Sequence, residues 1–80
     1  MQWNRSYPCK AYPPAQIRTG WSSWDDKEKS VKYAYPDTRG HIARSSPEIG
    51  GEILLEMLEA ALKDGIVTPK EVAAILHRSL

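Results

Sequence analysis

The residues with reactive side chains are few, and their spacing assembles no catalytic site. Cys9 is the single cysteine, and the two histidines are His41 and His77. A thiol nucleophile needs a histidine beside it, and no spacing in this sequence brings Cys9 to either one. The three residues also lack the paired-cysteine or His-x-x-x-His spacing of a metal site. We therefore predict no enzymatic activity, no catalytic residue, no metal ion and no cofactor.

Two further patterns that suggest chemistry have structural explanations. Glu52, Glu56 and Glu59 recur at helical spacing, which is typical of a solvated helix face. The Gly50-Gly51 pair lacks the Lys-Ser/Thr that completes a phosphate-binding loop. Neither pattern indicates a catalytic acid and base or a nucleotide site.

Cations and aromatic rings are the recognition groups that this sequence offers, and they are concentrated in its first half. All three Trp and four Tyr residues lie between Trp3 and Tyr35, and residues 1–45 hold eight of the eleven Lys and Arg residues. Trp, Tyr and Arg are frequent at the centres of protein interfaces, and Lys and Arg also neutralise phosphates. We predict that the residues contacting a partner are Arg18, Trp24, Lys32, Arg39 and Arg44.

These groups fit more than one kind of partner. A larger protein or nucleoprotein complex is predicted first, with aromatic anchors and Arg pairing with acidic or phosphate groups. Direct DNA or RNA binding through a basic aromatic sheet face is the alternative, and a homodimer formed through the C-terminal helices is a third. Salt separates the first two, because binding to nucleic acid weakens steeply as salt rises.

The location of the protein is predicted from Cys9 and from the hydropathy of the chain. A single unpaired thiol suits a reducing compartment, so we predict a cytoplasmic protein. No apolar run approaches the length of a membrane span, and no secretory signal follows Met1. No membrane partner is expected.

Three antiparallel strands are predicted to present the contact residues, at residues 16–24, 31–35 and 41–44. The first is expected to bulge or bend at Gly20. The second has the clearest alternation in the chain, with Val31, Tyr33 and Tyr35 on one face and Lys32 and Ala34 on the other. We expect the Tyr face to pack on the helices and the Lys32 face, together with Arg18, to point outward.

Residues 1–15 are predicted to be an extended arm rich in proline and aromatic residues. Three of the six prolines lie here, and they exclude a helix and make a central strand unfavourable. The aromatic residues Trp3, Tyr7 and Tyr12 are costly to leave in water, so the arm is expected to pack over the body. The alternative is an arm that orders on a partner.

Residues 45–80 are predicted to form a hairpin of two helices. In the first helix, an apolar stripe is formed by Ile53, Leu54, Met57, Leu58, Ala61 and Leu62. Asp64-Gly65 is expected to end that helix, with Gly65 in the left-handed conformation. Thr68-Pro69-Lys70-Glu71 then combines an N-cap, a Pro at the first helical position and a capping-box Glu, so a second helix starts there.

The predicted fold class is α+β. It is a three-stranded antiparallel β-meander packed on a C-terminal two-helix hairpin, in the order β-β-β-α-α and as a single domain over residues 1–80. The sheet needs one face covered, and the apolar stripe of the first helix is the expected cover.

Two segments resemble known families. The sequence GIVTPKEV at residues 65–72 is similar to the Gly-Ile-Ile-Thr-x-x-Glu-Phe signature of SHOCT helical hairpins, over residues 54–80. That resemblance implies a role in association, although Ala73, Ala74 and Ile75 replace the Lys-rich second helix of the family. The sequence YAYPDTRGHIAR at residues 33–44, followed by a helix, resembles the DNA-binding sheets of phage integrase arm domains.

The chain as a whole resembles small phage-encoded inhibitors in its size and in its division into a basic aromatic half and an acidic helical half. Anti-CRISPR proteins are of this type, and they act by occupying a surface of a larger machine that handles nucleic acid. The predicted function is therefore that of a phage or mobile-element accessory protein that inhibits or modulates such a host machine. The alternative is a regulator that binds DNA or RNA directly.

Overall fold

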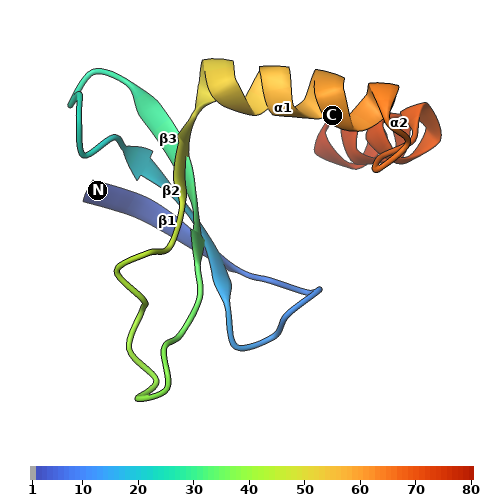
Figure 1. Ribbon diagram of the computed structural model, residues 1–80. Helices are drawn as coiled ribbons and strands as arrows, with labels where there is room; N and C mark the ends of the chain where they lie inside the picture. Colours follow the sequence, from blue (N-terminus) through green and yellow to red (C-terminus); the bar gives the residue numbers. More distant parts are fainter. Residues whose placement is uncertain (1) are drawn as a thin grey trace.

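The computed structural model describes residues 2–80, which form an antiparallel four-stranded sheet followed by two helices (Figure 1). The strands lie in the sheet in chain order, as a meander. The elements are β1 Gln2–Pro8, β2 Gln16–Trp21, β3 Lys29–Ala34, β4 Glu48–Gly50, α1 Gly51–Lys63 and α2 Pro69–Ser79. The predicted α+β class, a β-meander followed by two C-terminal helices, is confirmed.

β1 is the part of the predicted extended arm that joins the sheet. It pairs with β2 as an edge strand and ends at Pro8, where the missing N–H costs no ladder bond. Its register shifts by one residue between Trp3 and Arg5, opposite Gly20. The irregularity predicted at Gly20 therefore lies on the opposing strand. Gly20 allows it, because a side chain there would meet the backbone of Gln2 and Trp3.

β4 takes the place in the sheet that was predicted for residues 41–44, and that prediction is wrong. Residues 41–44 keep only an isolated bridge between Pro36 and Ile42. The strand that pairs with β3 comes later, with Ile49 opposite Val31. The difference arises because three residues are enough for a strand when a neighbouring strand supplies the hydrogen bonds.

A side-chain-capped turn explains why residues 41–44 do not extend as a strand. The Asp37 carboxylate oxygen Oδ1 accepts the backbone N–H groups of Arg39 and His41, at 2.8 and 3.0 Å. Gly40 has a φ of 82° and completes the turn. Asx turns of this kind compete with strand pairing for the same backbone groups.

β2 is shorter than predicted and ends at Trp21. Beyond it, Ser22 donates its N–H to the carbonyl of Glu28 at 2.8 Å, which closes the loop between β2 and β3. The buried hydroxyls of Ser22 and Ser30 hydrogen-bond across the base of this loop. Residues 22–24 therefore belong to a loop, because their backbone is used to close it.

The residues predicted to end the first helix and to start the second do so in the structure. Gly65 has a φ of 72°, and the capping box at Thr68 and Glu71 is formed in both directions, at 3.2 and 3.0 Å. The half-buried side chains of the hairpin are Leu58, Ala61, Leu62, Val67 and Val72. The turn at Gly65 and the start of α2 are confirmed, because each is set by residues a few positions apart. The predicted start at residue 45 is wrong, because Glu48–Gly50 form β4 and α1 begins at Gly51.

Replacing Thr68 by alanine is expected to lower the free energy of unfolding of the hairpin by about 1 kcal/mol, because the Glu71 N–H then loses its acceptor. Chemical denaturation followed by far-ultraviolet circular dichroism measures this. Thr68→Ser keeps the hydroxyl and should behave as the parent chain does. Equal losses in the two variants would show that the cap contributes nothing.

The apolar stripe of α1 does not cover the sheet, so the predicted packing is wrong. α1 continues directly from β4, contacts β3 and β4, and then runs outward with α2 beside its far end (Figure 1). No residue of either helix is buried. The reason is the junction: a helix needs a connecting loop to fold back over its own sheet, and none separates β4 from α1.

The buried interior is consequently small and lies within the sheet and its loops. Ala15 and Ala34 are fully buried, whereas Ala34 was expected to point outward. Tyr33 and Tyr35, expected in the core, are exposed and half-buried, with their ring centroids 5.6 Å apart. The assignment failed because it assumed that the helices cover the Tyr face, and no residue of either helix is buried. In the loop after β3, the hydroxyl of the buried Ser46 accepts the Tyr35 N–H.

Candidate functional site

Two of the predicted contact residues meet on one face of the sheet. Arg18 of β2 pairs with Lys32 of β3, so both side chains project from the same side. Ser6 lies opposite Arg18, and Trp3 of β1 projects from this side as well. We call this set, Trp3, Ser6, Arg18 and Lys32, the cationic face.

The Arg18 guanidinium is held by neighbours from two strands. Its Cζ lies 4.5 Å from the centroid of the Trp3 ring, a cation–π distance. Its Nε donates to Oε1 of Gln16 at 3.2 Å, and the Ser6 hydroxyl donates to the same oxygen at 2.8 Å. Because Nε and one flat side of the guanidinium are engaged, its terminal amino groups remain to bind a carboxylate or a phosphate.

Lys32 adds a second positive charge beside Arg18. Glu48, its partner on β4, forms no ion pair with Lys32, and its carboxylate instead accepts the N–H and the hydroxyl of Ser23 at 2.8 and 3.1 Å. Among residues 2–80, the single ion pair lies at the end of α1. Within residues 2–80, the two adjacent cations of the cationic face therefore form no ion pair with a carboxylate.

Trp24 lies on the β2–β3 loop at one end of the cationic face. A methyl group at Gly50 would lie 3.4 Å from its ring, so the ring rests on the backbone of β4. Its indole Nε1 donates to the Glu28 carboxylate at 2.8 Å. About half of the residue remains exposed, which leaves one side of the ring for contact while its donor is already used.

Arg39 and Arg44 belong to a different part of the molecule. Both are exposed on the segment between β3 and β4, which extends from the end of the sheet opposite α1 (Figure 1). The structure thus brings Arg18 and Lys32 together, places Trp24 at their edge and leaves the other two arginines on a separate loop.

Trp3 and Ser6 are the residues of the cationic face that the sequence prediction missed, and Trp3 is the more important of the two. It is 49% exposed and forms the support of Arg18. Its position depends on the pairing of β1 with β2 and on the register shift after it. The available signal was the proximity of Trp3, Arg5 and Tyr7 before Pro8, which has the composition of an edge strand.

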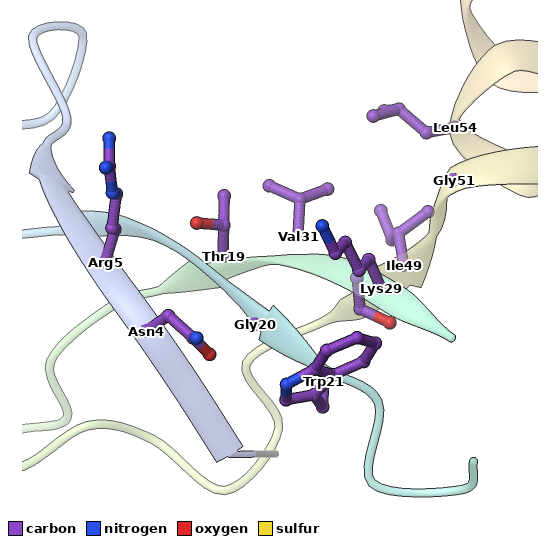
Figure 2. Close-up of a pocket in the computed structure, with 11 residues that line it drawn as sticks. Asn4, Arg5, Thr19, Gly20, Trp21, Lys29, Val31, Ile49, Gly51 and Leu54 are labelled. Atoms are coloured by element: carbon purple, nitrogen blue, oxygen red, sulfur yellow. The ribbon is translucent and has the colours of Figure 1, made fainter. Parts of the chain in front are cut away.

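The opposite face of the sheet carries a groove of about 480 Å³ (Figure 2). Its apolar floor and wall are formed by Val31, Ile49 and Leu54, with the Trp21 ring at one end. Thr19 lies between them and β1. We call this the α1 groove, because Leu54 of α1 forms part of its wall.

Two cations border the α1 groove. The Lys29 ammonium lies 5.6 Å from the centroid of the Trp21 ring, and the Arg5 side chain stands at the β1 side, beside Asn4 (Figure 2). Each face of the sheet therefore combines a cation with a Trp ring, but only the groove has an apolar floor.

The residues considered for chemistry do not converge. Cys9 is half-buried, and His41 and His77 are exposed on the β3–β4 loop and on α2. No three His, Cys, Asp or Glu side chains gather as metal ligands in the described part of the chain. Desolvation, with smaller contributions from Cys9 and neighbouring tyrosines, raises the pKa of Tyr33, so this phenol stays neutral at physiological pH.

No helix within residues 2–80 has the length and apolar character needed to cross a bilayer. Comparison with protein-family models, with curated proteins and with solved structures gives no match to this chain.

Proposed function

We propose that this chain is a non-enzymatic binding protein that recognises an acidic surface of a larger protein or nucleoprotein complex through its cationic face. The observation that carries the proposal is the pre-positioned Arg18, stacked on Trp3 and next to Lys32, with neither cation ion-paired to a carboxylate of residues 2–80. Holding a flexible side chain in its binding geometry before contact lowers the entropy lost on binding. Arg and Trp are also the residues that most often dominate interface energies.

A protein surface is favoured over bare nucleic acid because the cationic face is small. It holds two cations, and Glu48 adjoins Lys32 on the next strand. Arg39 and Arg44 lie on another loop and do not extend the face into a continuous basic stripe. Binding to a nucleic-acid backbone gains its affinity from several phosphate contacts in a row. Two cations suit a local acidic cluster better.

The biological role that we propose is that of a phage or mobile-element accessory protein that inhibits or modulates a host machine handling nucleic acid. Anti-CRISPR proteins, which this chain resembles in size and charge distribution, act in this way. Such a role needs occupation of a surface and no catalysis. The free thiol of Cys9 suits the reducing cytoplasm, where such machines act.

Direct DNA or RNA binding is the second candidate, and the exposed Trp3 ring favours it. A ring that is about half exposed beside two cations can stack on an unpaired base while the cations contact phosphates. This candidate predicts single-stranded nucleic acid as the ligand.

The test is capture of partners from a bacterial lysate with the tagged full chain, with and without nuclease, at low and at moderate salt. Our proposal expects the same protein partner to be retained in all four conditions, since an anchored contact depends less on salt than phosphate binding does. Loss of all captured material after nuclease treatment would contradict it and support the second candidate.

A further inference from the structure

The chain exposes more surface than a compact protein of its mass. Its accessible surface is 6612 Å², whereas a compact monomer of 9.0 kDa exposes about 4,900 Å². Its radius of gyration is 13.8 Å, compared with about 11.6 Å for a compact domain of this length. About 1,700 Å² of surface is therefore exposed beyond the expected amount.

Both helices expose large apolar side chains. On α1, Ile53 and Met57 form one exposed apolar ridge and are 54% and 49% exposed, and Leu55 on the other flank is 68% exposed. On α2, Ile75 and Leu76 are each more than half exposed. Exposed large apolar side chains that lie close together often mark an interaction surface.

The apolar surface of α1 continues into the α1 groove. Leu54 belongs to both, since it lies on the apolar side of the helix and also forms the wall of the groove above Val31 (Figure 2). The groove and the apolar ridge of α1 therefore form one continuous surface that meets at Leu54.

The groove and α1 carry charges of opposite sign. Arg5 and Lys29 border the groove, whereas α1 carries the exposed Glu56 and Glu59 beside its apolar residues, with Lys63 paired to Glu59 at 3.6 Å. An amphipathic helix with acidic flanks is the shape and charge that fits an apolar groove between two cations. This chain carries both the groove and such a helix.

We infer that a second copy of this chain occupies the α1 groove, with α1 of each copy lying in the groove of the other. A twofold arrangement satisfies both contacts at once, because each copy offers the same groove and the same helix. A stable interface takes about 800 Å² from each partner. The excess exposure of about 1,700 Å² is enough for that and leaves the cationic face free.

The first test is the molar mass of the full chain by sedimentation equilibrium over a wide concentration range. We expect twice the 9.0 kDa chain mass at high concentration. Met57→Glu places a charge on the apolar ridge and should weaken the dimer by at least about tenfold. Because Met57 is half exposed in the single chain, the variant should keep its circular dichroism spectrum, and Lys10→Glu on the β1–β2 loop should dimerise as the parent does.

The second test reverses charges across the contact. Arg5→Glu with Lys29→Glu, and separately Glu56→Lys with Glu59→Lys, should each weaken the dimer about tenfold or more. A chain that carries all four changes should recover most of the affinity, because attraction is restored with the signs exchanged.

Three results would overturn the inference. One is a chain that stays monomeric at every concentration and keeps the radius of gyration of 13.8 Å. Another is a compact monomer, which would mean that the hairpin closes over its own sheet. The third is a dimer that Met57→Glu disrupts but the groove charges do not affect, since the hairpins would then pair with each other and not with the groove.

Discussion

Gly20→Ala is expected to lower the free energy of unfolding of the sheet by about 2–3 kcal/mol, the upper range for overpacking. The reason is the close approach of β1 at its register shift, where an added Cβ would meet the Gln2 carbonyl and the Trp3 Cα. Both atoms belong to the backbone and cannot rotate away. Chemical denaturation, with the indole fluorescence as the signal, measures the loss.

The matched control for that substitution is Gly51→Ala. Gly51 opens α1, and no atom lies within 4 Å of the position of its Cβ. Alanine there should leave stability unchanged or raise it by up to about 1 kcal/mol, because it restricts the unfolded chain. If Gly20→Ala proves as mild as Gly51→Ala, β1 does not approach β2 as described, and the support of Arg18 by Trp3 is lost with it.

Arg18→Glu is expected to weaken partner binding by about 30-fold or more, the effect of losing a hot-spot residue. The change removes the terminal donors and places a negative charge beside Trp3 and Lys32. Isothermal titration with the captured partner measures it. Arg18→Lys keeps the charge but loses the planar stacking and the Nε bond, so its affinity should fall between those of the parent and Arg18→Glu.

Lys70→Glu is the control for Arg18→Glu, since it makes the same charge change on α2, away from the sheet. An acidic residue in the first turn of a helix is also favourable for stability. Equal losses of affinity in Lys70→Glu and Arg18→Glu would show that overall charge, and not the cationic face, determines binding.

The helical hairpin could be predicted in detail because its signals are local. Gly65 ends α1 through its own conformation, and Thr68 and Glu71 bond to each other within one turn. None of these interactions depends on the rest of the chain. The alternation around Lys32 likewise identified β3 without knowledge of its neighbours.

The sheet edges and the packing could not be predicted because they depend on distant partners. β4 consists of three residues with no strand pattern of their own, and β3 supplies its hydrogen bonds. Whether α1 covers the sheet depends on the connection at Gly50, and the apolar stripe looks the same in either case.

The cationic face was predictable in part. The pairing of Arg18 with Lys32 follows from β2 and β3, which the sequence located approximately. The role of Trp3 could not be predicted, because it depends on how β1 pairs with β2. Three prolines in residues 1–15 made a strand there look unfavourable. Trp21 lies in the α1 groove and not on the cationic face, because β2 has no bulge at Gly20.

The positions of two Trp residues on opposite faces make one measurement decisive for the proposed binding surface. In a ¹H–¹⁵N spectrum of the labelled chain, the indole N–H signals of Trp3 and Trp21 report on the cationic face and on the α1 groove. On titration with the captured partner, we expect the Trp3 signal to shift or broaden while the Trp21 signal stays in place. A shift confined to Trp21, with Trp3 unchanged, would contradict the account and place the partner in the groove.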